Sequence, residues 1–327
     1  MQKSKGWQPT AGLENLQFRA QFLSKIRDFF YKRGVLEVET PLMCNGAATD
    51  PHITPIAVLY SDPHLLDNQN YYLQTSPEFA MKRLLAAGSG PIYQICKAFR
   101  RDEIGRLHNP EFSLLEWYRP GFDHHALMDE VEALLCLILG TSKAERLTYQ
   151  AAYQKFVGLD PHAVSAEQLK HCALSKGIIL SAAAMNTLTV DDWLDILMTH
   201  CIEPHLGFEN PVMIYDFPIS KAALAKVRDV VPAVGERFEV YVRGTELANG
   251  YHELTDPDIQ LERIQADCEY RRTNGLMEIP IDFRLISALK AGLPDSAGVA
   301  LGLDRLLMLM LGSHEIQEVV SFTTDRA

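Results

Sequence analysis

The sequence lacks closely spaced cysteines, long apolar runs and an excess of positive charge. Its six cysteines include no C-x-x-C pair, which argues against a zinc or redox site built from cysteines, so we expect reduced and mostly buried thiols. No stretch reaches the roughly 18 apolar residues that a membrane helix needs, and residues 1–10 lack the apolar segment of a signal peptide. We therefore expect a cytoplasmic protein that makes no membrane contact.

The charge balance argues against a long nucleic-acid surface. The chain has 31 lysines and arginines against 42 aspartates and glutamates, a formal net charge of -11. Proteins that follow a nucleic-acid backbone usually carry a broad positive field, so tRNA is not expected as a partner. The 327 residues are 47% hydrophobic, which is ample for a folded core.

Hydrophobic periodicity predicts helices and strands in alternation, without repeats or a low-complexity linker. Helices are predicted over 16–30, 76–87, 125–139, from 256 onward and over 304–311. Strands are predicted over 35–40, 71–75, 92–100, 111–118, 212–217, 236–254 and 297–302. Antiparallel hairpins with helices at both ends indicate an α+β fold, an antiparallel sheet flanked by helices. We expect a single domain over residues 1–327 with a mainly helical insertion at about 145–205.

The first segment that suggests chemistry is the hairpin that ends near residue 118. Strand alternation puts Phe112, Glu116 and Tyr118 on one face, so a ring, a carboxylate and a phenol point the same way. Such a face suits a binding floor, on which the ring stacks a purine while Arg100 and His108 meet phosphates. The alternative is an ordinary charged hairpin with one apolar face.

A second hairpin carries two carboxylates. If Arg243-Gly244 is its two-residue turn, Tyr241 lies opposite Glu246, and Glu239 lies diagonally from Glu246 on the same face. Carboxylates placed so close repel unless a cation lies between them, and hard oxygen ligands suit Mg²⁺ bridging to phosphates. The alternative is a pair of exposed hairpin acids.

Glu253 follows on the same strand. In a regular strand it would fall on the opposite face from the two carboxylates, so we expect a bulge at Asn249-Gly250 to turn it back.

The third segment runs from Gly298 to Arg305. Glycines let a backbone approach a ligand, and an arginine in the first turn of a helix is unfavourable unless an anion is near, so Arg305 is predicted to clamp a phosphate. A glycine-spaced strand that leads into a core helix is the alternative.

In order along the chain, these segments resemble the three signature motifs of class II aminoacyl-tRNA synthetases. Residues 34–41 resemble motif 1, 100–118 resemble motif 2 and 302–305 resemble motif 3. The resemblance covers nearly the whole chain and implies the class II catalytic fold. Motif 1 builds the dimer interface in that class, so the resemblance also implies a homodimer.

Within the class, residues 106–112 and 245–254 are most similar to the lysyl-tRNA synthetase catalytic domain. That similarity implies that Arg100 and Arg305 are catalytic, touching the α-phosphate and the γ-phosphate, and that Glu239 and Glu246 bind Mg²⁺. The implied ATP site comprises Arg100, Arg101, Asp102, His108, Asn109, Phe112, Glu246, Leu247, Gly302 and Arg305. The implied substrate site comprises Ser76, Pro77, Glu78, Glu116, Tyr118, Asn249, Glu253 and Ala300.

Departures from the lysyl-tRNA synthetase pattern narrow the resemblance further. The motif 1 helix begins near residue 13, which leaves no room for an anticodon-binding domain, and Ser76 and Ala300 replace an expected Ala and Gly. A shortened, altered form of this kind resembles the elongation factor P (R)-β-lysine ligases. The resemblance implies activation of (R)-β-lysine, or lysine, with ATP and transfer to a lysine side chain of elongation factor P.

Two other functions remain open. One is a stand-alone amino-acid ligase with a small acceptor, such as an asparagine-synthetase-like enzyme. Its acidic substrate would fit poorly against Glu78 and Glu253. The other is a non-catalytic synthetase paralogue that acts as a sensor or scaffold. Such paralogues usually lose nucleotide-binding groups, whereas Arg100, Phe112 and Arg305 are present here.

Overall fold

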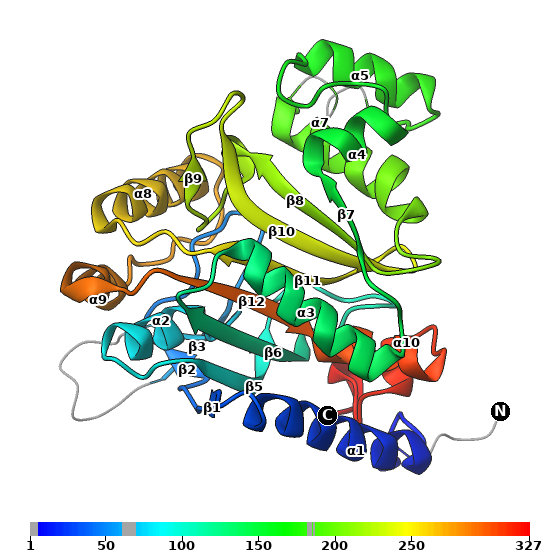
Figure 1. Ribbon diagram of the computed structural model, residues 1–327, viewed down its shortest axis with the longest axis vertical. Coiled ribbons are helices and arrows are strands. Elements are labelled where there is room, and N and C mark those ends of the chain that lie inside the picture. Colours follow the sequence, from blue (N-terminus) through cyan, green and yellow to red (C-terminus); the bar gives the residue numbers. More distant parts are fainter. Residues whose placement is uncertain (1–5, 61–69, 182–184, 186) are drawn as a thin grey trace. The chain divides into compact units, whose positions relative to one another are not determined.

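The computed structural model describes residues 6–60, 70–181, 185 and 187–327 (Figure 1). The chain forms two compact units, which we call unit 1 (residues 1–121 and 255–327) and unit 2 (residues 122–254). Both units combine strands with helices, which confirms the predicted α+β class. The single domain over 1–327 and the insertion over 145–205 stay predictions.

Unit 1 contains strands in the order β1-β5-β6-β12. Their bounds are β1 (Leu36–Glu37), β5 (Ile92–Phe99), β6 (Glu111–Pro120) and β12 (Ser296–Gly302). β5 and β6 form the predicted antiparallel hairpin, and β12 continues the sheet antiparallel to β6. β1 pairs in parallel with β5, so the sheet is mixed at this edge. β1 ends at Glu37 and is shorter than the predicted 35–40, although the Val38 N–H still donates to the Tyr93 carbonyl at 2.9 Å.

Helices and a small second sheet complete unit 1. The helices are α1 (Leu13–Tyr31), α2 (Glu78–Ala86), α8 (Pro257–Thr273), α9 (Phe283–Gly292) and α10 (Leu303–Leu311), with the short η4 (Ile316–Glu318) and η5 (Thr324–Arg326). The small sheet has the order β2-β4-β3, with β2 (Met43–Cys44), β4 (Tyr71–Leu73) and β3 (Ile56–Val58). α2 and α9 pack together through a shared apolar core that includes Met81, Leu85 and Leu289.

The start of α2 differs from its prediction. The sequence predicts a helix from residue 76, whereas α2 begins at Glu78 and its N-cap is Pro77. The Ser76 hydroxyl still accepts a hydrogen bond from the Glu78 N–H at 3.0 Å, so it supports the first turn from one residue further out.

Unit 2 contains strands in the order β11-β10-β8-β7, and β9 also pairs with β10. The strands are β7 (Glu145–Thr148), β8 (Val212–Pro218), β9 (Val227–Arg228), β10 (Val234–Val242) and β11 (Thr245–His252). The helices are α3 (His124–Leu139), α4 (Tyr149–Phe156), α5 (Ala166–Ser175) and α7 (Val190–Leu197), followed by η1 (Met198–Ile202), η2 (Glu203–His205) and η3 (Ile219–Lys221). α4, α5 and α7 share an apolar core with β8 that includes Tyr149, Trp193 and Phe217 (Figure 1).

The β10–β11 hairpin has the predicted turn. Val242 lies opposite Thr245 and Tyr241 opposite Glu246, and both turn residues, Arg243 and Gly244, have a positive φ, as a two-residue hairpin turn requires.

A bulge follows this turn, but earlier than predicted. Val240 pairs with Ala248, so Leu247 is the extra residue, and the ladder is regular at 249–250. The predicted place of the bulge is therefore wrong. The extra side chain is apolar and only 3% exposed, so the shift lets it enter the core. The consequence matches the prediction, because alternation from Asn249 onward carries Glu253 to the face of Glu246.

The structure also tests the predictions of buried thiols and of a chain without a membrane helix. All six cysteines lie in the described part of the chain and are free, but each is half-buried instead of buried as predicted. Among the described residues, no helix is both long enough and apolar enough to cross a membrane.

Candidate functional site

Unit 1 brings together the arginines, the ring and the histidine predicted for the nucleotide. The Arg100 guanidinium lies 5.0 Å from the centre of the Phe112 ring, and its Nη1 donates to Glu103 at 3.0 Å. The Arg100 Nε is buried and has no hydrogen-bond acceptor within the described residues. Arg305 Nη2 lies 2.5 Å from His108 Nε2. One end of the β5–β6 hairpin and the start of α10 therefore meet at this cluster.

His108 is arranged as a neutral ring. Burial lowers its pKa from the usual value, and the guanidinium of Arg305 lowers it further. The short contact with Arg305 requires His108 Nε2 to accept, because a guanidinium can only donate. A neutral histidine here leaves the positive charge of the cluster on the arginines.

A buried aspartate positions the start of α10. Asp304 is 2% exposed, and its Oδ1 pairs with Arg19 Nη1 at 2.7 Å while its Oδ2 accepts from the Ser113 N–H at 2.7 Å. α1, β6 and α10 are thus tied at one carboxylate, which fixes the backbone from which Arg305 extends. Gly302 is the N-cap of the same helix.

Three other predicted nucleotide residues on the motif 2 loop have different surroundings. Arg101 and Asp102 are exposed and lie 3.8 Å apart as a loose ion pair. Asn109 is buried, donates to the Glu111 carbonyl at 2.6 Å and accepts from the Thr324 N–H at 3.1 Å. Its amide holds the C-terminal segment in place, and the nucleotide role of all three stays a prediction.

Glu116 is the centre of the predicted substrate residues in unit 1. Its carboxylate is 2% exposed and accepts from the Ser76 hydroxyl at 2.8 Å and the Tyr118 hydroxyl at 2.7 Å. Ala300 lies directly opposite Glu116 in the β6–β12 ladder. The two positions that depart from the lysyl-tRNA synthetase pattern, Ser76 and Ala300, therefore both adjoin this carboxylate.

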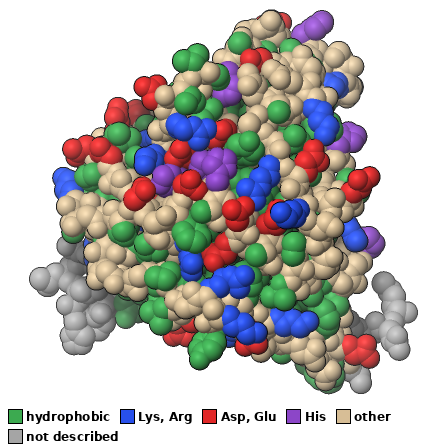
Figure 2. All heavy atoms as spheres, in the orientation of Figure 1, with side chains coloured by type: hydrophobic (Ala, Val, Ile, Leu, Met, Phe, Trp, Pro, Cys, Tyr) green, Lys and Arg blue, Asp and Glu red, His purple; other side chains and the backbone are tan. Residues whose placement is uncertain are grey.

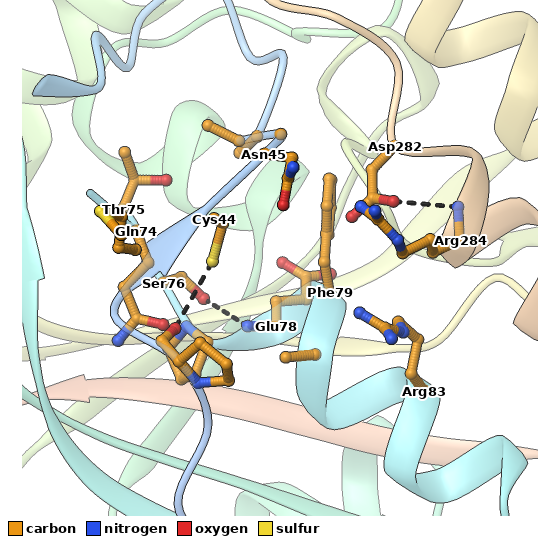
Figure 3. A pocket seen from close by; sticks show the side chains of 17 residues that line it. Cys44, Asn45, Gln74, Thr75, Ser76, Glu78, Phe79, Arg83, Asp282 and Arg284 are labelled. Carbon is orange, nitrogen blue, oxygen red and sulfur yellow. Dashed lines mark hydrogen bonds between the residues drawn. The ribbon is translucent and has the colours of Figure 1, made fainter. Parts of the chain in front are cut away.

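Glu78 lies at the start of α2 beside a cavity of about 240 Å³ in unit 1 (Figure 3). Ser76 and Pro77 also line this cavity. The Glu78 carboxylate pairs with the buried Lys82 ammonium at 2.6 Å, one helical turn away. Figure 3 shows Arg83, from the same helix, and Arg284 on the same side of the Phe79 ring. The cavity wall thus offers charged groups of both signs.

Unit 2 holds the two carboxylates predicted for the metal. Glu239 is 8% exposed, and its carboxylate accepts from the Arg237 guanidinium and, at 2.5 Å, from the Tyr241 hydroxyl. Arg237 Nε also donates to the Asn249 side-chain oxygen at 3.2 Å. Glu246 lies on the same face because it pairs across the ladder with Tyr241. Glu239 is therefore held in one orientation before any cation binds.

Two residues of these clusters, Lys82 and Arg237, were not predicted from the sequence. Lys82 pairs with Glu78 at the i,i+4 spacing of a helix, and Arg237 pairs with Glu239 at the i,i+2 spacing of a strand. Both spacings can be read from a sequence once the element type is known. The contacts between Arg305 and His108, 197 positions apart, have no such local signal.

The surface carries both signs of charge. On the face seen in Figure 2, acidic and basic side chains of the described residues are interspersed. Large apolar side chains of α1, β1 and β2 are exposed, among them Tyr31 at 83%, Leu36 at 56% and Met43 at 38%. Residues 34–41 are those that resemble motif 1.

Comparisons with known proteins find one family and similar full-length relatives over nearly the whole chain. The family model described as tRNA synthetases class II (D, K and N) matches residues 9–326. A relative from Vibrio cholerae serotype O1, named elongation factor P–(R)-β-lysine ligase, is 51% identical over 321 residues, 98% of each chain. Relatives of the same name from Enterobacter sp. (strain 638) and Salmonella arizonae are 47% and 48% identical over 327 residues, 100% of each chain.

Proposed function

The chain belongs to the class II tRNA synthetases of the D, K and N group, and from its similarity to relatives named elongation factor P–(R)-β-lysine ligase we propose that it is an ATP-dependent ligase. It activates (R)-β-lysine, or lysine, as an aminoacyl-adenylate and transfers the acyl group to a lysine side chain of elongation factor P. The observation that carries the proposal is the identity of 47% to 51% to those ligases over essentially the full length of both chains.

The unit 1 cluster fits a triphosphate. Arg100 has a buried Nε donor that no described residue satisfies, and a buried donor without an acceptor costs about 1–3 kcal/mol. A phosphate oxygen would remove that cost. Phe112 offers its ring to the adenine, and Arg305, aligned by His108, offers a second guanidinium to the phosphates.

The unit 2 carboxylates fit Mg²⁺. Glu239 and Glu246 share a face, and the hydrogen bonds from Arg237 and Tyr241 orient Glu239 while leaving lone pairs for a cation. Oxygen ligands of this kind, completed by water and phosphate, are the ones that Mg²⁺ prefers. When bound, the ion would neutralise charge on the phosphates of ATP.

The substrate has two amines and one carboxylate. Binding both amines requires two separated anionic groups in the site. In unit 1 the first-turn carboxylate of Glu78 would bind the amine nearest the reacting carboxyl, with Lys82 sharing the same carboxylate. Tyr118 and, in unit 2, Glu253 would recognise the distal ammonium. The Ser76 hydroxyl donates to the Glu116 carboxylate at 2.8 Å, and this hydrogen bond orients both side chains. Together they would limit the space available to the amine.

Adenylation needs positioning more than proton transfer. The substrate carboxylate, ionised at neutral pH, attacks the α-phosphorus, the bond to the bridging oxygen breaks, and pyrophosphate leaves with the electron pair. Arg100 and Arg305 stabilise charge on the phosphate oxygens. In the second step the acceptor amine, as the free base, attacks the acyl carbon, AMP leaves, and the amine's proton passes to solvent or a base.

The acceptor, the assembly and the compartment follow from the same proposal. Elongation factor P takes the place of tRNA, in keeping with the net charge of -11. A second copy of the chain covers the exposed apolar side chains of α1, β1 and β2, such as Tyr31 and Leu36. The interface would include the residues that resemble motif 1, which forms the dimer interface in this class. An enzyme that modifies a translation factor acts in the cytoplasm.

Pyrophosphate exchange tests the activation step. With ATP and Mg²⁺, we expect exchange that depends on (R)-β-lysine, weaker exchange with lysine and none with aspartate. Exchange with aspartate alone would favour a ligase for an acidic substrate. Absence of exchange with every amino acid, from a chain shown to be folded, would favour a non-catalytic paralogue.

A further inference from the structure

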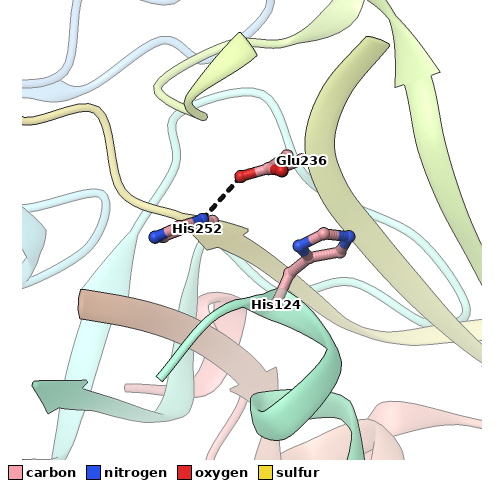
Figure 4. A group of neighbouring side chains, drawn as sticks. All are labelled: His124, Glu236 and His252. Atoms are coloured by element: carbon pink, nitrogen blue, oxygen red, sulfur yellow. Dashed lines mark hydrogen bonds and ion pairs between the residues drawn. The ribbon is translucent and has the colours of Figure 1, made fainter. Parts of the chain in front are cut away.

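Unit 2 gathers a second cluster of polar side chains at the start of α3, outside the residues assigned to ATP and substrate. His124 is the first residue of α3, Glu236 lies on β10 and His252 ends β11. One donor atom from each lies within 4.8 Å of the other two. Figure 4 shows the three side chains converging from these elements, with His252 Nδ1 at 2.5 Å from Glu236 Oε2.

His124 is the member that needs explaining. Its side chain is 1% exposed, and neither ring nitrogen has a hydrogen-bond partner within the described residues. Its Nε2 faces Asp216 Oδ1 at 3.5 Å, which is an ion pair when the ring is protonated, but neither atom makes a hydrogen bond within the described residues. Each buried polar group without a partner costs about 1–3 kcal/mol, so both atoms are placed for a ligand that they can bind.

Arg228 determines which carboxylate oxygens face the histidines. Its Nη1 donates to Glu236 Oε1 at 3.2 Å and its Nη2 to Asp216 Oδ2 at 2.5 Å. The remaining oxygens, Glu236 Oε2 and Asp216 Oδ1, are the ones beside His252 and His124. A guanidinium that binds the outer oxygen of each carboxylate orients the inner oxygen, which is how neighbouring residues usually align metal ligands.

The backbone also brings these carboxylates together. Gly235 pairs with Phe217 and Phe238 with Tyr215, so two residues of β10, Glu236 and Arg237, oppose Asp216 alone. Asp216 has a φ of 59°, in the left-handed region. A Cβ on Gly235 would lie 2.7 Å from the Ala222 Cβ, so the bulge depends on glycine there.

We propose that His124, Glu236 and His252, with Asp216 as a fourth ligand, form a site for Zn²⁺. Two imidazole nitrogens with two carboxylate oxygens suit Zn²⁺ better than Mg²⁺, which prefers oxygen alone. Tetrahedral bonds of about 2.0–2.1 Å place donors roughly 3.4 Å apart, so donors near the 4.8 Å limit must move about 1.4 Å closer together. The two carboxylates and Arg228 together carry one negative charge, which attracts a dication.

This site is separate from the proposed Mg²⁺ carboxylates. Successive side chains of a strand point to opposite faces, so His252 lies on the other face of β11 from Asn249, which pairs with Glu239. Zn²⁺ there would lie on the opposite face of the sheet from Glu239 and Glu246. It would join α3 to β8, β10 and β11, so its effect is on the stability of unit 2.

The test measures metal content and stability in the full chain, purified without a histidine tag and stripped with a chelator. Zn²⁺ is added in the presence of excess Mg²⁺, which occupies the carboxylate pair on the other face. We expect one Zn²⁺ per chain and a higher melting temperature with Zn²⁺ than without it. Co²⁺ in its place should give the visible absorption of a tetrahedral nitrogen–oxygen site.

Matched variants localise the ion. His124→Ala should weaken Zn²⁺ binding by at least about 10–100-fold and remove the rise in melting temperature. His171→Ala, which alters an exposed histidine on α5 of the same unit, should leave both unchanged. Glu236→Gln provides a second test should His124→Ala fail to fold. Absence of stoichiometric Zn²⁺ in the unaltered chain would overturn the proposal, as would equal binding by His124→Ala or loss of binding in His171→Ala.

Discussion

Replacing Arg100 with alanine should separate catalysis from folding. Its ion pair with Glu103 spans 3.0 Å between side chains that are 27% and 32% exposed, so its loss should cost about 0.2–1 kcal/mol. The contact with the Phe112 ring at 5.0 Å adds about 0.5–1 kcal/mol. A total near 1 kcal/mol corresponds to a fall in melting temperature of roughly 2–4 °C. The fold should therefore survive.

The catalytic loss should be far larger. A preorganised donor at a developing charge is worth about 2.7–4 kcal/mol, so pyrophosphate exchange should fall at least about 10²–10³-fold. Arg272→Ala is the matched control, because Arg272 also pairs with a glutamate three residues away, Glu269, at 2.6 Å in unit 1. Both variants are compared by thermal melting and by exchange. Near-normal exchange by Arg100→Ala, or an equal loss in Arg272→Ala, would refute the role of Arg100.

Three further predictions concern stability, specificity and pH. Asp304→Asn should lower the free energy of unfolding by about 3 kcal/mol in urea titrations, because Arg19 loses its buried anion; a change below about 1 kcal/mol would contradict this. Ser76→Ala removes a hydrogen bond to buried Glu116 and should lower exchange with (R)-β-lysine about 10-fold relative to lysine, whereas an unchanged ratio would exclude a specificity role. Burial is the main cause of the lowered pKa of His108, so near pH 6 the unfolded chain binds a proton that the folded chain does not. The free energy of unfolding should therefore fall as the pH drops through about 6.5. His108→Gln should reduce that fall.

The sequence predicts those parts of the fold that depend on neighbouring residues. Arg243-Gly244 specifies a two-residue turn, and the turn alone fixes that Tyr241 meets Glu246. Strand alternation likewise predicts that Glu116 and Tyr118 share a face, and their hydroxyl–carboxylate bond of 2.7 Å agrees. Local chemistry is sufficient in both cases.

Other features depend on tertiary packing and could not be predicted in the same way. The bulge lies at Leu247, where burial of an apolar side chain decides the register, instead of at Asn249-Gly250, two to three residues later. α9 was not predicted, although Asp282 before it is a cap signal, since its side chain accepts from the Arg284 N–H. His124 and His252, which come together with Glu236, are more than a hundred residues apart in the sequence. No periodicity predicts that they meet.

The acceptor distinguishes an elongation factor P ligase from a tRNA synthetase, and a label-transfer experiment identifies it. The chain is incubated with ATP, Mg²⁺ and labelled (R)-β-lysine, together with elongation factor P and lysine-specific tRNA in the same reaction. We expect label on elongation factor P at a lysine side chain, with AMP and pyrophosphate as products. Label on tRNA with none on elongation factor P would contradict it.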